Sequence, residues 1–248
     1  MAPVLSLRGI EKSYGAVAAL KGIDLDIGRG EVLAICGDNG AGKSSLVRII
    51  SGAQEPSAGA ITLEGKAVSF RSPQDALAKG IATIYQDLAL APRLSIVQNV
   101  FMGAELTRPL LPFVHVLDKR RMEALAKGYL GRLSVAVEDM HRPVERLSGG
   151  QRQAVAISRA LHWDAQVVIM DEPTAALGVK ETALVLDLIR KLNAEGRTVV
   201  LISHNMADVT AVATRVAILK SGRKVIDRPV AGLDADGLAH MVMTGKES

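Results

Sequence analysis

A single cysteine among 248 residues excludes one class of fold at once. With only Cys36 available, the chain forms no internal disulfide, so a small secreted domain held by disulfides is ruled out. Cys36 ends an apolar run that starts at Val32, and a continuous run of this kind is typical of a strand buried on both faces. We therefore expect a reduced, intracellular protein whose stability comes from a hydrophobic core.

Aromatic residues are also scarce, at 3% of the chain, and no apolar run approaches the ~18 residues of a membrane-spanning helix. The scarcity of aromatic residues argues against a surface on which nucleic-acid bases stack. The net charge is +4, but the basic residues are scattered and their densest run is only Lys119-Arg120-Arg121. The N-terminus lacks the pattern of a signal peptide. We predict no nucleic-acid partner, and any work at a membrane would be that of a peripheral subunit.

The order of patterns along the chain predicts one α/β domain over residues 1–248. Short alternating strands fill the first third, helical spacing follows, and apolar strands then alternate with helices in the last part. Ser72 and Asp118 are each well placed to cap a helix. Strand–helix–strand alternation predicts a parallel sheet. We expect a β-rich N-terminal lobe and an α/β core over about 1–87 and 156–248. A helical insertion would cover about 88–155.

A phosphate-binding loop is predicted by the pattern G-x-x-x-x-G-K-[ST], which residues 37–44 fit. Its glycines let backbone N–H groups turn toward phosphates, and the following helix adds its positive dipole end. The alternative is a glycine-rich surface turn, but an apolar strand precedes the run and a helical one follows. The predicted nucleotide-binding residues here are Gly37, Asp38, Asn39, Gly40, Ala41, Gly42, Lys43, Ser44 and Ser45. Lys43 would contact the β- and γ-phosphates, and Ser44 would be a Mg²⁺ ligand.

Two adjacent acids, Asp171 and Glu172, end the apolar run that begins at Val167. Ligands of open α/β sheets bind at the carboxyl ends of strands. We expect Asp171 to orient Mg²⁺ and Glu172 to act as the general base that polarises the attacking water. The alternative is that one acid caps the next element, before a turn that starts at Pro173.

A second glycine motif consists of Leu147, Ser148, Gly149, Gly150 and Gln151. Ser148 and Gln151 fit a helix-capping box, which is a purely structural alternative. That box leaves the glycine pair unexplained, because each glycine weakens a helix by about 1 kcal/mol. We interpret the pair as bare backbone that permits close approach, and helix N-termini bind anions. The motif would then close over the nucleotide held by another copy of the chain.

The three motifs, in this order, resemble the nucleotide-binding subunits of ABC transporters, and the resemblance covers essentially the whole chain. It implies a phosphate-loop (RecA-like) ATPase core with an N-terminal antiparallel β lobe and a helical insertion subdomain. It also implies that two subunits sandwich two ATP molecules head to tail. Each site would join one subunit's phosphate loop to the other's signature motif, the name of the second glycine motif in that family.

Further residues follow from the resemblance alone. It implies that Tyr14 stacks on adenine, that Gln86 contacts Mg²⁺ and links to the membrane subunit, and that His204 reaches the γ-phosphate as a second catalytic residue. Without it, Tyr14 would be a packed tyrosine, Gln86 a surface residue and His204 structural. Gly178 departs from the family, whose commoner pattern ends Ala-Leu-Asp, and this departure puts the coupling between the two ATP sites in doubt.

Three stretches are similar to monosaccharide importers of the fructose and ribose type: residues 37–39, 70–73 and 173–181. The resemblance implies an ATPase at the cytoplasmic face of a membrane, with an integral permease and, indirectly, a periplasmic or extracellular sugar-binding protein as partners. One phosphate loop means that the chain pairs with a copy of itself or a homologue. The alternatives are a soluble non-transport ABC ATPase, an importer of another solute, a phosphate-loop kinase and a non-hydrolysing regulatory module. The exact sugar and the stoichiometry with the permease stay open.

The segment 88–117 is apolar without a regular period. We predict that part of it forms the groove for a cytoplasmic helix of the permease, with a local core under a loop as the alternative. Its candidate residues are Leu90, Ile96, Val97, Phe101 and Phe113.

Overall fold

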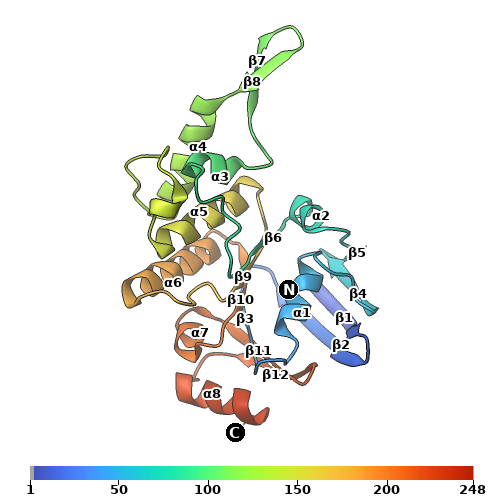
Figure 1. Cartoon of the computed structure of the whole chain (residues 1–248). Coiled ribbons are helices and arrows are strands. Elements are labelled where there is room, and N and C mark those ends of the chain that lie inside the picture. Colours follow the sequence, from blue (N-terminus) through green and yellow to red (C-terminus); the bar gives the residue numbers. More distant parts are fainter. Residues whose placement is uncertain (1–2, 248) are drawn as a thin grey trace.

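The computed structural model describes residues 3–247, which form an α/β core between a β lobe and a helical region (Figure 1). A six-stranded sheet runs through the core in the order β12-β11-β3-β10-β9-β6. Its strands are β3 Val32–Cys36, β6 Ile81–Ile84, β9 Val167–Asp171, β10 Thr198–Ile202, β11 Arg215–Lys220 and β12 Arg223–Pro229. All pairings are parallel except that of β12 with β11, so the predicted parallel sheet is confirmed.

The N-terminal lobe is an antiparallel sheet in the order β2-β1-β4-β5. Its strands are β1 Pro3–Tyr14, β2 Val17–Gly28, β4 Ala58–Leu63 and β5 Lys66–Val68. Helix α1, Lys43–Ile50, packs with this lobe and with one face of the central sheet in a single hydrophobic cluster. The helix that follows the phosphate loop is therefore held from two sides.

The other face of the central sheet carries the helical region, whose apolar side chains form a second cluster. This region contains α3 Ile96–Phe101, α4 Lys119–Arg132, the short helix η1 Val144–Arg146, α5 Gly149–His162 and α6 Val179–Ala194. A hairpin of β7 Thr107–Leu111 and β8 Val114–Leu117 projects from it, at the opposite end of the molecule from α8 (Figure 1). The remaining helices are α2 Pro73–Ala78, α7 Met206–Val212 and α8 Ala235–Thr244.

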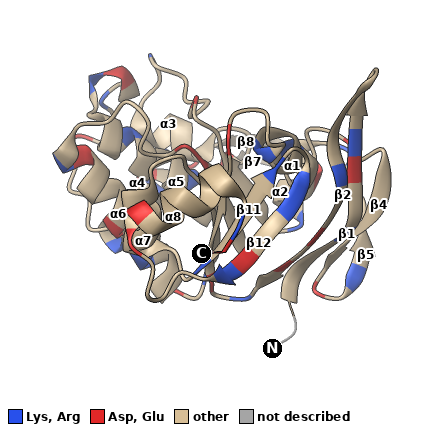
Figure 2. Cartoon of the chain, turned by 90° about the horizontal axis from the view of Figure 1, so that it is seen from below, with Lys and Arg blue, Asp and Glu red and all other residues tan. Residues whose placement is uncertain are grey.

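The surface charge of the molecule is mixed. Figure 2 shows basic and acidic residues interspersed along the ribbon, on helices and strands alike. None of the helices within residues 3–247 has both the length and the apolar composition of a membrane span.

Helix caps follow the local sequence closely. The predicted caps are present: the Ser72 hydroxyl accepts from the Asp75 N–H at 3.2 Å, and the Asp118 carboxylate accepts from the Arg121 N–H at 3.1 Å. A capping box at Ser95 and Gln98 starts α3, inside the segment that lacked a predicted period. The S-x-x-Q spacing was the available signal for that helix.

The prediction that Phe101 lines a groove is wrong. Its side chain is completely buried, and its ring centroid lies 4.3 Å from that of His162 on α5. Ile96 and Val97 are buried in the same cluster, so this part of the segment is a local core. Phe113 lies at the opposite extreme, fully exposed at the tip of the β7–β8 hairpin. A helix as short as α3 is not stable in water by itself, so it depends on packing its apolar side chains into the core.

Replacing Phe101 by alanine should lower the free energy of unfolding by about 3–5 kcal/mol, since a buried ring is lost and a cavity remains. Phe113→Ala is the matched control and should change stability by no more than about 0.5 kcal/mol. Chemical denaturation followed by circular dichroism measures both. Equal stability of the two variants would contradict the placement of Phe101 in the core.

Candidate functional site

The phosphate loop joins the centre of the sheet to α1. Strand β3 is wholly buried between β10 and β11, and its chain leaves the sheet at Gly37. Gly42 has a φ of 107°, and a Cβ there would lie 2.7 Å from Leu20 Cδ2 and 2.8 Å from the Ala19 carbonyl oxygen. Only glycine meets both conditions. Because Gly42 is the N-cap and brings no capping side chain, the N–H groups of the first turn of α1 are left for a ligand.

Lys43 is held over the loop. Its Nζ donates hydrogen bonds to the carbonyl oxygens of Gly37 at 2.6 Å and Asp38 at 3.0 Å. The ammonium therefore lies on the concave side of the loop, where a point charge can meet phosphate oxygens.

One cleft of about 590 Å³ brings the phosphate loop together with three other predicted residues. The predicted site residues that line it are Asn39, Gly40, Ala41, Gly42, Lys43, Ser44, Ser45, Gln86, Asp171 and Glu172. They meet because β3, β6 and β9 are parallel neighbours or near neighbours, and their carboxyl ends lie along one edge of the sheet.

Glu172 has an unusual backbone conformation for a residue other than glycine, with a φ of 51°. Its N–H donates to the Ile202 carbonyl oxygen at 2.9 Å, and its Oε2 lies 2.7 Å from His204 Nδ1. Such backbone strain persists only where the surroundings fix it, and it concentrates at functional sites. The structure thus joins the two predicted catalytic residues directly.

Asp171 is a half-buried carboxylate that no N–H or O–H within residues 3–247 reaches with a hydrogen bond. Burial raises its pKa, and the charge of Glu172 raises it further, while Lys43 and Arg48 oppose the shift. A nearby cation would offset this cost.

The donors around Asp171 fit Mg²⁺. The Ser44 hydroxyl, the Gln86 amide oxygen and the Asp171 carboxylate line the same cleft, and all are oxygen donors. No group of three or more His, Cys, Asp or Glu side chains suited to a metal occurs in the described part of the chain. Mg²⁺ needs none, because it keeps waters and phosphate oxygens as most of its ligands.

Tyr14 lies beside the start of α1, outside the lining of the phosphate cleft. Its hydroxyl is within hydrogen-bond distance of the Gln54 amide oxygen and, at 3.4 Å, of the Ser45 hydroxyl. The side chain is 40% exposed. One edge of the ring is tied to the phosphate-loop helix, and much of the rest remains open.

The signature motif forms the capping box that its sequence allows. The Gln151 N–H donates to Ser148 Oγ at 3.3 Å, and the Ser148 N–H donates to Gln151 Oε1 at 3.1 Å. Leu147 is buried beneath this turn. The motif does not line the phosphate cleft of its own chain, and Gly149 lines a neighbouring cleft of about 350 Å³ that shares Gln86 and Glu172 with the phosphate cleft.

The missing side chains of Gly149 and Gly150 make room for residues of the same chain, a structural reason for the glycine pair that the sequence interpretation did not include. Both are buried, and a Cβ on Gly149 would lie 2.4 Å from Leu177 Cδ2, while one on Gly150 would lie 2.8 Å from Leu184 Cδ2. The close approach is made by α6 and the loop before it. The Gly149 N–H is also used, since it donates to Glu181 Oε1 at 2.9 Å.

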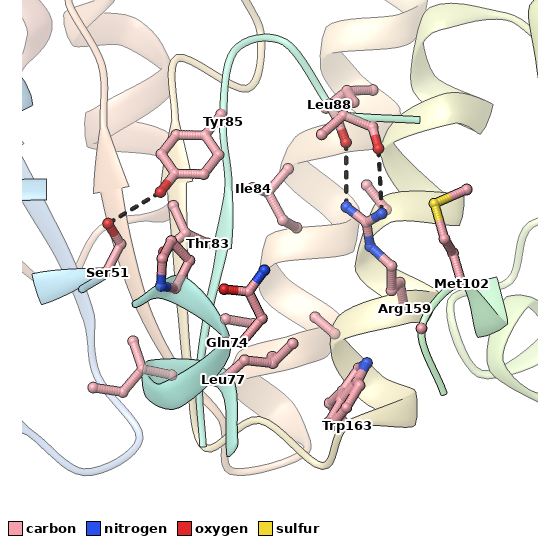
Figure 3. Close-up of a pocket in the computed structure, with 17 residues that line it drawn as sticks. Ser51, Gln74, Leu77, Thr83, Ile84, Tyr85, Leu88, Met102, Arg159 and Trp163 are labelled. Carbon is pink, nitrogen blue, oxygen red and sulfur yellow. Dashed lines mark hydrogen bonds between the residues drawn. The ribbon is translucent and has the colours of Figure 1, made fainter. Parts of the chain in front are cut away.

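A groove of about 400 Å³ lies between α2, β6 and α5 (Figure 3). Leu77, Met102 and Trp163 give it an apolar lining. Arg159 donates to the carbonyl oxygens of Ala89 at 3.2 Å and Leu88 at 3.4 Å, and burial lowers its pKa. The pattern-based reading of the sequence gave Arg159 and Glu181 no role, because these contacts join residues distant in the chain.

Comparison with known proteins gives consistent relatives. The ABC transporter family matches residues 20–175. The chain is 50% identical to the fructose import ATP-binding protein FrcA of Rhizobium meliloti, over 90% of this chain and 87% of that protein. It is 46% identical to the xylose/arabinose import ATP-binding protein XylG of Sulfolobus acidocaldarius, over 92% and 89%. It is 40% identical to the ribose import ATP-binding protein RbsA 3 of Rubrobacter xylanophilus, but spans only 48% of that longer protein.

Solved structures of ABC transporter components have the same fold as this chain. A component of an ABC transporter complex from Clostridium perfringens superposes with a TM-score of 0.78 and 28% identity, covering 98% of this chain and 93% of that one. A dimeric ATP-binding cassette in a post-hydrolysis state, bound to ADP and phosphate, superposes with a TM-score of 0.75 and 26% identity, covering 92% and 100%.

Cys36 provides a test of how firmly the base of the phosphate loop is packed. Its thiol is fully buried, and this burial raises its pKa to about 12. At pH 9 the folded protein should hold roughly 500-fold less thiolate than the unfolded chain, so alkylation by iodoacetamide should be slow until guanidinium unfolds the protein. Rapid alkylation of the native protein would show that β3 opens.

Proposed function

We propose that this chain, an ATPase that belongs to the ABC transporter family, energises the import of a monosaccharide across a membrane. The observation that carries the proposal is the meeting of the phosphate loop with Gln86, Asp171 and Glu172 in one cleft. The sugar class is supported by relatives named for fructose, xylose/arabinose and ribose import. A fructose-like sugar is our choice within that class, since the fructose import protein shares half of its aligned residues with this chain.

The chain's own residues divide the work of hydrolysis. The loop N–H groups and Lys43 bind the β- and γ-phosphates and hold the terminal phosphate at the edge of the sheet. Glu172 takes a proton from the attacking water, and His204 holds the Glu172 carboxylate in place from 2.7 Å. Mg²⁺, held by Ser44, Gln86 and Asp171, would neutralise charge on the phosphates. We assign Tyr14 to the adenine.

We infer that a complete site needs two chains. The signature motif lies outside its own phosphate cleft, yet the Ser148 hydroxyl is exposed at the N-terminus of α5. The Gly150 N–H is not used by any hydrogen bond within residues 3–247. These two donors suit the γ-phosphate held by a second copy, with Leu147 and Gln151 fixing the turn that presents them. The dimeric cassette solved with ADP and phosphate supports this arrangement.

We further propose that the groove in Figure 3 receives a cytoplasmic segment of the permease. Leu88 and Ala89, which follow Gln86 closely, form one wall, so an occupant would press on the chain that leads to the ATP site. The chain would then sit at the cytoplasmic face, and a sugar-binding protein on the other side would deliver the substrate.

Glu172→Gln should slow hydrolysis by at least about 10²-fold, because the amide cannot accept the proton from water, while ATP still binds. Lys43→Ala should lose ATP binding itself. Phosphate release and calorimetry separate the two effects in the purified protein. Hydrolysis near the wild-type rate in Glu172→Gln would remove this residue from the role of base.

The same variants test the transport role in cells. Uptake of labelled fructose, ribose and xylose should fall for one sugar when the chain is deleted. Wild type should restore that uptake, and Glu172→Gln should not. If no sugar is affected, the monosaccharide proposal is wrong and the ATPase has another partner.

Met102→Glu should abolish co-purification with the permease without unfolding the chain, because a charge would enter the apolar groove. Met243→Glu places the same change on an exposed position of α8 and is the matched control. Retention of the permease by Met102→Glu, with ATP binding intact in both variants, would exclude this groove as the docking site.

A further inference from the structure

Glu181, in the first turn of α6, joins the starts of two helices. Its Oε1 accepts the 2.9 Å hydrogen bond from the Gly149 N–H at the start of α5. Its Oε2 accepts a longer one, 3.4 Å, from the N–H of Gly178, the N-cap of α6. A negative charge between two helix N-termini is stabilised by both dipoles.

Packing reinforces this link. Leu177 and Leu184 occupy the space that side chains at positions 149 and 150 would need. Farther along α5, Gln153 Nε2 donates to the Pro173 carbonyl oxygen at 2.8 Å in a buried position. The first turns of α5 and the loop 173–178 are therefore packed and hydrogen-bonded to each other.

That loop begins at the proposed catalytic base. Glu172 immediately precedes it and contacts His204, and Thr174 Oγ1 donates to Asp208 on α7 at 2.6 Å. One end of the loop is thus connected to the ATP site of its own chain, and the other end contacts the signature motif.

Gly178 cannot make a side-chain contact across the dimer, and a Cβ there would meet nothing within 4 Å. A path between the two ATP sites must then run through other groups. The bridge from Gly178 through the Glu181 carboxylate to Gly149 is the charged link available at this point of the loop.

We propose that Glu181 is a positioning residue that orients the signature motif and couples it to the ATP site of its own chain. The inference rests on the proposed two-chain site. By occupying the Gly149 N–H, Glu181 leaves the Ser148 hydroxyl and the Gly150 N–H as the donors turned toward the partner's γ-phosphate. Loss of the carboxylate frees the Gly149 N–H and unties α5 from the loop, so the motif meets the partner's ATP in a less defined orientation.

The test uses the full chain in a Glu172→Gln background, where ATP is bound and hydrolysed slowly. Sedimentation velocity measures the dimer dissociation constant with ATP, and calorimetry at low protein concentration measures ATP binding by the monomer. Glu181→Ala should raise the dimer dissociation constant roughly tenfold, the effect of one charge-assisted hydrogen bond, with monomer ATP affinity within about twofold. Glu181→Gln keeps an acceptor oxygen for the Gly149 N–H and should lose less.

Asp187→Ala is the matched control, because it removes an acid paired with Lys191 on the same helix. It should leave dimerisation unchanged. An unchanged dimer dissociation constant in Glu181→Ala, or an equal loss in Asp187→Ala, would overturn the inference. So would a parallel fall in monomer ATP affinity and thermal stability, which indicates a merely structural role. If the Glu172→Gln parent stays monomeric with ATP, the two-chain site itself is wrong, and the inference falls with it.

Discussion

The burial of β3 at the centre of a parallel sheet is the constraint on which the chemistry of this chain depends. Hydrogen bonding to β10 and β11 fixes where β3 ends, and the chain must turn there into the phosphate loop. Because β9 ends along the same edge, Asp171 and Glu172 line the same cleft as Lys43, although the two segments are far apart in the chain. The β lobe then closes on the loop at Gly42, where only a bare backbone fits.

The charges of the site's side chains favour the binding of ATP together with a cation. Two carboxylates stand side by side at the end of a buried strand, and one ammonium faces them. Burial raises the pKa of Asp171, and the charge of Glu172 raises it further. Nucleotide phosphates alone would add to the negative charge, so ATP and a divalent cation are expected to enter together. The strained backbone of Glu172 is held by its contacts to Ile202 and His204, which belong to the next strand and the turn after it.

Local patterns predicted the parts of the fold that local physics decides. A few consecutive residues are enough to specify each of three features: the strand that begins at Val167, the helix caps at Ser72 and Asp118, and the phosphate loop. Close approach between distant segments has no such signature. The burial of Phe101 against His162 and the contact of Gly149 with Glu181 depend on how helices pack, so periodicity could not distinguish a groove from a core. The resemblance to ABC transporters supplied the predicted roles of Gln86 and His204, which composition alone would have left as ordinary polar residues.

The packing of Leu177 and Leu184 against Gly149 and Gly150 also limits how this ATPase can evolve. Leu177 and Leu184 occupy volume that exists only while positions 149 and 150 lack a Cβ. A larger residue at position 149 or 150 requires a smaller one opposite, and the intermediate with only one of the two changes contains a clash or a void. Substitutions at these four positions are therefore expected to occur together, even though the positions lie in two separate segments of the chain.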